Sequence, residues 1–325
     1  MPNGQWYPPE WPVRIRALAA GEITAATPRR AATVMLVRDG PGGSGGSAAT
    51  PGGPGGPAAP GGSDRTAGSD RTTGSGGPGP FVHMLRRRAS MAFAAGAYVY
   101  PGGGVDPRDN DRLIGWAGPG RDVWARRLGV DAASAQAIVC AAVRETYEEA
   151  GVLLAGESAE SVVSDTTGDD WEADRAALVD RGLSFADFLD RRGLVLRSDL
   201  LGAWTRWITP EFEPRRYDTW FFVAALPTGQ RTRNASTEAD RTVWIRPAEA
   251  TAAYDKGELL MMPPTVSTLR QLQSYRTAAE ALAGAEGRDM TPVLATARLE
   301  DGELVLSWPG HDEFTKRVDP TGGPR

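Results

Sequence analysis

The sequence predicts a protein of the mixed α and β class, and three observations carry that prediction. Short apolar, β-branched segments flank a long glycine- and proline-rich stretch, at Ala31–Gly40 and Phe81–Ala89. One long helical pattern follows at Ala135–Ala150. Further strands and then helices come after it, so the two periodicities alternate along the chain. With 325 residues, the chain can bury the core of one large domain or two small ones.

Composition restricts the classes of function. The net charge of −5 and the pI of about 5.3 provide no basic surface, so nucleic acid is not an expected partner. Cys140 is the single cysteine, which excludes an intramolecular disulfide and favours a reducing cytoplasm. The opening MPNGQWYPPEWP lacks the regions of a signal peptide, and no run approaches 18 apolar residues. We therefore expect a soluble cytoplasmic protein without a membrane partner.

The glycine- and proline-rich stretch, residues 41–80, is expected to be a disordered insertion. From Gly40 to Pro80 there is no aromatic residue and no Ile, Leu, Met or Val. Such a segment cannot bury enough apolar surface to offset the entropy of ordering it. The strands on either side read as one hairpin with an enlarged turn, which loop-closure entropy tolerates. The insertion therefore interrupts one sheet and is not expected to separate two domains.

The elements beyond the hairpin follow in order. AYVYPGGG (Ala97–Gly104) predicts a strand ending in a glycine turn, and a polar stretch punctuated by proline and glycine follows from Arg108 to about Asp131. The central helix has Ser134 as its expected N-cap and Gly151 as its C-cap. The later elements are a helix at Ser184–Leu194, strands at Leu201–Pro210 and Arg216–Pro227, a strand and a helix within Asp240–Leu259, a helix over Pro263–Ala285, and a hairpin turned at Asp301–Gly302.

The central helix carries a cluster of charges. Glu145 lies three positions before Glu148 and four before Glu149, so all three carboxylates share one helical face, and Arg144 can pair with Glu148. Taken alone, such a face is usually solvated surface. The alternative is that the carboxylates bind a hard divalent cation, for which an oxygen-only ligand set favours Mg²⁺ or Mn²⁺ over zinc.

The neighbouring residues favour the metal. RETYEEAGV (Arg144–Val152) resembles the second half of the Nudix hydrolase signature, departing only at Thr146, and YPGGGVDP resembles the strand-to-glycine entry before it. Arg144 lies 41 positions after Gly103, against 14 in the uninterrupted pattern, so an insertion of about 27 residues splits the box. Counted back from Arg144, the first acid of the pattern falls on Gln136; counted from Gly103, it falls on Asp109. Asp109, Gln136 or neither remains possible.

The split box resembles a coenzyme A diphosphatase subgroup of that family, and the likeness extends from about Arg29 onward without the insertion. It implies an α/β/α sandwich with a mixed β-sheet. The expected organisation is an N-terminal extension (1–28), a Nudix domain (29–280), and a C-terminal hairpin and tail (281–325) packed on the domain.

The resemblance also implies roles for residues. Glu148, Glu149 and the backbone carbonyl of Gly102 would bind Mg²⁺ or Mn²⁺. Glu145 would bind a second metal or deprotonate the attacking water, and Arg144 would orient the glutamates. Glu238 is the candidate for a further catalytic acid from a late loop. The reaction would be hydrolysis of a nucleoside diphosphate linked to another group.

The substrate stays open at this level. Coenzyme A or an acyl derivative is preferred, with a nucleotide sugar or a dinucleotide as alternatives. Arg86, Arg87 and Arg88 could face a 3′-phosphate or form a solvated strand end, and Arg215 and Arg216 could contact phosphate. Trp204, Trp207 and Trp220 could stack on adenine or fill the core.

The sequence contains few residues that could form other kinds of catalytic or metal site. His83 and His311 are the only histidines, which leaves almost nothing for a Ser-His-Asp triad or a zinc site. A catalytically inactive ligand sensor with the same fold is the rival of a different class, and the four intact charged residues of the helix oppose it. A homodimer is possible.

Overall fold

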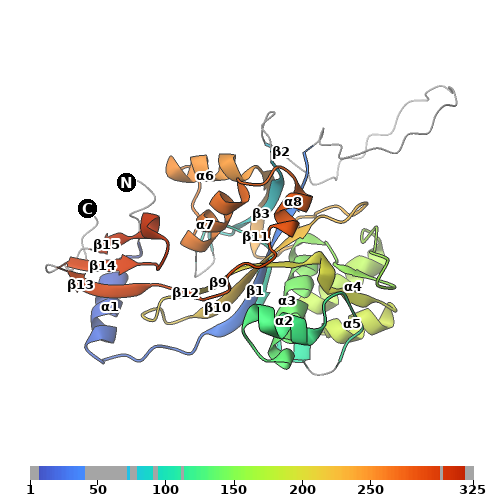
Figure 1. The fold of residues 1–325 in the computed structure, drawn as a ribbon, viewed down its shortest axis with the longest axis horizontal. Coiled ribbons are helices and arrows are strands. Elements are labelled where there is room, and N and C mark those ends of the chain that lie inside the picture. The colour runs from blue at the N-terminus through green and yellow to red at the C-terminus, as the bar shows by residue number, and fades with distance from the viewer. Residues whose placement is uncertain are drawn as a thin grey trace.

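The computed structural model describes residues 7–40, 72–73, 79–90, 94–110, 113–300 and 303–318. The predicted α/β class is confirmed, because a mixed sheet lies between two groups of helices (Figure 1). The helices are α1 (Trp11–Ala19), α2 (Arg121–Leu128), α3 (Ala132–Ala150), α4 (Asp169–Val179), α5 (Phe185–Arg191), α6 (Pro247–Asp255), α7 (Pro263–Leu272) and α8 (Ala278–Ala283). Figure 1 shows α2 to α5 on one side of the sheet and α6 to α8 on the other.

The central sheet has the order β12-β9-β10-β1-β3-β11-β2, and in addition β5 pairs with β1 and β4 with β3. Strand β1 runs parallel to β10 and antiparallel to both β3 and β5. The strands are β1 (Arg29–Arg38), β2 (Thr72–Thr73), β3 (Phe81–Arg87), β4 (Tyr98–Val99), β5 (Gly102–Gly104), β9 (Gly202–Ile208), β10 (Tyr217–Ala225), β11 (Ala239–Ile245) and β12 (Val293–Leu294).

Alternating residues of β1 separate two hydrophobic cores. Val34 and Leu36 pack with α3 and its neighbours, whereas Met35 and Val37 pack with the residues of α6, α7 and α8. This period of two is what a strand buried on both faces requires. Two smaller three-stranded sheets complete the fold: β6 (Trp116–Ala117), β7 (Ala155–Gly156) and β8 (Val195–Arg197), and β13 (Thr296–Glu300), β14 (Glu303–Ser307) and β15 (Lys316–Val318).

The hairpin predicted across the insertion is present, since Val37 pairs with Val82 and Arg38 with Phe81. The insertion itself lies outside the described residues except for β2 and residues 79–80. The C-terminal hairpin is also present as β13 and β14, while its predicted turn, Asp301–Gly302, lies outside the described residues. The proposed boundaries at residues 28 and 280 stay predictions.

Several local expectations were wrong. Asp131, not Ser134, caps α3, because the Asp131 carboxylate accepts the Ser134 backbone N–H at 2.8 Å and the helix begins one turn earlier. The polar stretch from Arg108 to about Asp131, for which the sequence predicted no element, contains most of the short 3₁₀ helix η2 (Pro107–Asn110), β6 and α2. The single helix expected over Pro263–Ala285 is divided into α7 and α8. Within the described residues, no helix combines the length and apolar character that crossing a membrane needs.

Candidate active site

Helix α3 places the charged cluster at the end of a buried element. Its earlier turns bury Ile138, Val139 and Val143 against the sheet, and its last turns carry Arg144 to Glu149. Gly151 ends the helix with φ of +70°, and its N–H donates to the Tyr147 carbonyl. The cluster is therefore held by the most thoroughly buried helix of the fold and is not a solvated surface.

Arg144 joins the two halves of the split motif. Its Nη1 donates to Glu145 Oε1 at 2.8 Å and to Glu148 Oε1 at 3.1 Å. On the other side, Nε and Nη2 donate to the two oxygens of Asp109 at 3.1 Å each, and Nη2 also donates to the Gly104 carbonyl at 2.9 Å. The Arg144 and Asp109 side chains are 10% and 2% exposed, so this is a buried, bidentate pair.

Of the candidates that the sequence left open for the first acid, Asp109 is thus the one that contacts Arg144. It lies on η2, directly after the glycine turn. Gln136 is turned to other partners: its Oε1 accepts from Arg121 Nε at 2.5 Å, and its Nε2 donates to the Asp109 carbonyl at 3.4 Å. Of the two alternatives, only Asp109 contacts the Arg144 guanidinium.

The glycine turn lies against the carboxylates. Gly102 N–H donates to Glu149 Oε2 at 2.9 Å. Since the N–H and C=O of one strand residue point to the same side, the Gly102 carbonyl is also directed away from β1. A Cβ on Gly103 would lie 2.5 Å from the carboxyl atoms of Glu145. The missing side chain therefore allows β5 to approach α3 this closely.

Burial dominates the electrostatics of the site. It raises the pKa of Glu145 to about 7, although the Arg144 charge works in the opposite direction. Burial raises the pKa of Glu149 to about 8, and the charge of Glu145 adds to this shift. The pKa values of Glu148 and Asp109 are likewise raised by burial. These carboxylates are therefore crowded into a region of low polarity. Protonation or a bound cation would lower the free-energy cost of their buried charges.

A loop after β10 adds a residue that the sequence did not indicate. Ser236 Oγ donates to Glu149 Oε1 at 3.2 Å and accepts the Glu238 backbone N–H at 3.2 Å. A serine two positions before an acid has no distinctive sequence signal. Glu238, predicted as a catalytic acid, lies beside this site; its side chain is 57% exposed and its Oε2 is 3.7 Å from Arg87 Nη1.

The predicted substrate-binding arginines divide into two groups. Arg86 and Arg88 lie at the end of β3 near Glu238: Arg86 forms a bidentate pair with Asp240 at 2.7 and 3.0 Å, and Arg88 Nε donates to the Ala239 carbonyl at 3.4 Å. Arg216 does not join them. It is buried and donates to the carbonyls of Thr209 and Ala26, which connects the N-terminal segment to the turn between β9 and β10.

The aromatic candidates belong to the core. Trp204, Trp207 and Trp220 are at most 5% exposed, which agrees with packing and leaves no face open for adenine. His83 packs on Trp244, and burial lowers its pKa to about 3. His311 packs on Trp207 at a centroid distance of 4.7 Å.

The donor set suits a divalent cation in its chemistry. Three carboxylates share the single guanidinium of Arg144, and Glu149 bonds to neutral groups, the Gly102 N–H and the Ser236 hydroxyl. As the described side chains stand, no three His, Cys, Asp or Glu residues are gathered closely enough to hold an ion. Glu148 faces Arg144 and Glu149 faces Gly102, so binding requires these side chains to turn.

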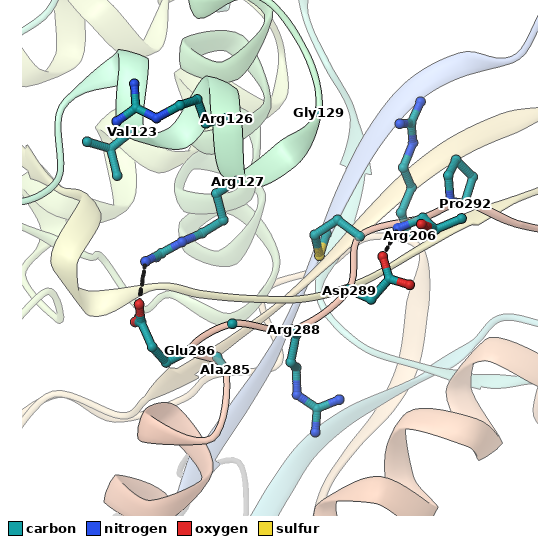
Figure 2. Close-up of a pocket in the computed structure, with 13 residues that line it drawn as sticks. Val123, Arg126, Arg127, Gly129, Arg206, Ala285, Glu286, Arg288, Asp289 and Pro292 are labelled. Carbon is teal, nitrogen blue, oxygen red and sulfur yellow. Dashed lines mark hydrogen bonds and ion pairs between the residues drawn. The ribbon is translucent and has the colours of Figure 1, made fainter.

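A separate groove of about 660 Å³ lies near the other end of α3 (Figure 2). Its lining includes Arg126 and Arg127 of α2, Arg206 of β9, and Glu286 and Asp289 of the loop after α8. Figure 2 shows Arg127 reaching across to Glu286, at 3.3 Å. The groove contains neither the glutamates of the candidate site (Glu145, Glu148, Glu149 and Glu238) nor the residues that bond to them. Because the groove lacks the clustered carboxylates, the candidate active site is the carboxylate cluster and not the groove.

A mixed sheet between helices and an arginine–glutamate cluster facing a glycine turn are the features by which this chain resembles the Nudix hydrolases. Comparison with known proteins agrees: the family model of the NUDT19 Nudix domain matches residues 125–272. The match and the relatives indicate a Nudix pyrophosphohydrolase that resembles the acyl-coenzyme A diphosphatases. The family match begins within α2 and so does not include the glycine turn or Asp109.

Two curated relatives and one solved structure document the likeness. Acyl-coenzyme A diphosphatase NUDT19 of Gallus gallus is 27% identical over 289 residues, which cover 74% of each chain. The protein of the same name from Xenopus laevis is 24% identical over 282 residues, covering 74% of this chain and 73% of the relative. A Nudix hydrolase from Alicyclobacillus acidocaldarius superposes with a TM-score of 0.58 at 24% identity, covering 79% of this chain and 96% of its own, and supports the fold.

Proposed function

We propose that this Nudix hydrolase requires Mg²⁺ or Mn²⁺ and cleaves the pyrophosphate bond of coenzyme A or an acyl-coenzyme A. The products would be adenosine 3′,5′-bisphosphate and a phosphopantetheine compound. The carrying observation is that Arg144 joins Glu145 and Glu148 to Asp109 and Gly104, so the two halves of the split motif form one site. The names of the two vertebrate relatives support the substrate class.

Glu148, Glu149 and the Gly102 carbonyl are the groups that would hold the metal. Mg²⁺ or Mn²⁺ held there would supply positive charge that neutralises pyrophosphate oxygens and makes water easier to deprotonate. Arg144 holds Glu145 and Glu148 by charge-assisted hydrogen bonds, and the Gly102 N–H and Ser236 hydroxyl orient Glu149. These bonds satisfy the carboxylates before any ligand arrives, and Glu148 and Glu149 would exchange part of them for the metal.

Glu145 is suited to accept the proton of the attacking water. Its Oε1 is bonded to Arg144 Nη1, which leaves Oε2 as the acceptor. A pKa of about 7 lets this carboxyl both take and release a proton near neutral pH. Glu238 is the second candidate, because it is exposed beside Ser236 and can reach groups that enter from solvent.

Arg86 and Arg88 are proposed to meet the phosphate groups of the substrate. They lie next to Glu238 at the start of β11, on the side of the site that solvent reaches. The Arg86–Asp240 pair is exposed, and such a pair is weak enough for a phosphate to displace the carboxylate. Arg216 is left out of this proposal because its bonds serve the N-terminal segment.

The test is hydrolysis of coenzyme A, acyl-coenzymes A, nucleotide sugars and dinucleotides with Mg²⁺ or Mn²⁺, by wild type and Glu149→Gln. We expect turnover of coenzyme A compounds by the wild type and a loss of at least about 100-fold in Glu149→Gln. Glu157→Gln, at an exposed glutamate outside the cluster, is the matched control and should retain turnover.

The same panel decides between the alternatives. Preference for a nucleotide sugar or dinucleotide would replace the substrate proposal within the same family. Full turnover by Glu149→Gln would remove this residue from the metal site. A wild type that hydrolyses nothing, yet melts at higher temperature with a nucleotide ligand, would indicate a sensor. The cytoplasmic location and a homodimer stay predictions.

A further inference from the structure

The loop of residues 230–238, which carries Ser236 and Glu238, is attached to the end of α3 through a residue of α4. Glu172 accepts hydrogen bonds from two arginines, Arg175 through its Nε at 2.9 Å and Nη2, and Arg233 through its Nη1 at 3.2 Å. Arg175 belongs to α4 and Arg233 to the loop. We call these three residues the Glu172 clamp.

Both arginines of the clamp also donate hydrogen bonds to the last carbonyls of α3. Arg175 Nη1 donates to the Glu148 carbonyl at 2.7 Å and to the Ala235 carbonyl at 3.3 Å. The Arg233 backbone N–H donates to the Ala150 carbonyl at 2.9 Å. Helix ends leave their last four carbonyls without partners inside the helix, and a positive charge there is favourable. The clamp therefore satisfies the end of α3 and fixes the loop to it.

The attachment is close in space. A Cβ on Gly151 would lie 2.6 Å from Arg233 Nε, so the arginine lies directly on the glycine that ends α3. Ala235, whose carbonyl Arg175 holds, immediately precedes Ser236. Ser236 in turn donates to Glu149 Oε1. A continuous set of contacts thus runs from Glu172 to a glutamate of the active site.

We propose that Glu172 is a positioning residue: by holding Arg175 and Arg233, it fixes the loop so that Ser236 orients Glu149 and Glu238 stays beside the site. The catalytic part of this inference rests on the proposed function. Loss of the Glu172 charge would weaken its hold on both arginines, because Arg175 and Arg233 are held by the two carboxylate oxygens together and a glutamine presents only one acceptor oxygen and an NH₂ group in place of the other. Displacement of reacting groups by about 1 Å can cost on the order of 100-fold in rate.

The experiment compares Glu172→Gln with Asp174→Asn. Asp174 lies on the same helix and also bonds two arginines, Arg191 at 3.2 Å and Arg192 at 2.7 Å, but these belong to α5 and its end. Its side chain is 12% exposed against 47% for Glu172. If Glu172→Gln lowered activity only by destabilising the fold, Asp174→Asn should therefore lower activity at least as much.

Three measurements are made on both variants: kcat and KM, the melting temperature, and hydrogen exchange of residues 230–238. We expect Glu172→Gln to lower kcat by about tenfold or more with KM within about twofold, and to speed exchange of the loop. Asp174→Asn should lower the melting temperature with kcat and loop exchange unchanged. Glu172→Asp, which keeps the charge, should recover part of kcat.

Two results would overturn the inference. One is unchanged loop exchange in Glu172→Gln, and the other is faster exchange with wild-type kcat. Failure of the wild type on every substrate is a different result, because it defeats the proposed function and leaves the exchange measurement valid. In that case the Kd for Mn²⁺, measured by electron paramagnetic resonance, replaces kcat. It should rise at least about threefold in Glu172→Gln and not in Asp174→Asn, and an unchanged Kd refutes the role of the clamp.

Discussion

The substitution Asp109→Asn tests the contact that joins the two halves of the site. The wild-type aspartate accepts from Arg144 through both oxygens at 3.1 Å, and the two side chains are 2% and 10% exposed. Removing one partner of a buried ion pair costs about 3–5 kcal/mol. Asparagine keeps one acceptor, and Arg144 keeps Glu145, Glu148 and the Gly104 carbonyl. We therefore expect the free energy of unfolding to fall by an amount near the lower end of that range, about 3 kcal/mol.

Activity should fall as well, because Arg144 also sets the orientation of Glu145 and Glu148. We expect kcat to fall by about 10- to 100-fold. Urea unfolding measures the stability change, as a lower midpoint with an unchanged dependence on urea concentration. The comparison variant is Gln136→Met, which loses the bonds to Arg121 and to the Asp109 carbonyl but directly removes none of the Arg144 bonds. If Asp109→Asn keeps kcat while Gln136→Met loses it, the assignment of the first acid to Asp109 is wrong.

Three further predictions concern the same region. Gly103→Ala should abolish turnover, because the added Cβ would lie 2.5 Å from the Glu145 carboxyl; a variant with wild-type kcat would contradict that close approach. Burial raises the pKa of Glu145 to about 7 and of Glu149 to about 8, so the folded protein holds these protons more tightly than the unfolded chain. In EDTA its melting temperature should thus fall as the pH rises from about 5 to 8, and Mg²⁺ should reduce the fall; a flat profile would refute this. Burial raises the pKa of the Cys140 thiol, so Ellman's reagent should label it only after unfolding, and rapid labelling of the native protein would show otherwise.

The sequence was sufficient for the features that depend on local pattern. The period of α3, its C-cap Gly151 and the face shared by Glu145, Glu148 and Glu149 all follow from neighbours within five positions. It was not sufficient for α4, whose apolar residues do not form a distinct stripe. Nor did it indicate Ser236, whose bond to Glu149 spans 87 positions. Contacts of that separation depend on tertiary packing, which a local pattern does not encode.

Arg216 shows that a local pattern can also indicate a functional role that tertiary packing does not support. Its position beside aromatic residues and another arginine suggested a phosphate contact, yet the guanidinium is buried and bonded to the backbone of Thr209 and Ala26. An arginine has five donors in a rigid fork, and it can satisfy carbonyls in a turn as well as phosphate oxygens. Residue type alone cannot distinguish the two uses, because the difference lies in which acceptors the fold brings within reach.

The interrupted motif shows why spacing in the sequence is a poor guide to whether such a site is intact. Asp109 and Arg144 are 35 positions apart, but β5 pairs with β1 next to α3 and η2 follows at once, so the acid arrives at the guanidinium regardless of what comes between. The described residues between them include β6, α2 and the first turns of α3, and α2 packs on α3 through the buried Trp124 and Leu128. Lengthening a loop costs only about 0.6 kcal/mol for each doubling, which this added packing can offset. What the chemistry requires is therefore the meeting of a strand end with a helix end, and an insertion that leaves both ends in place can preserve the site.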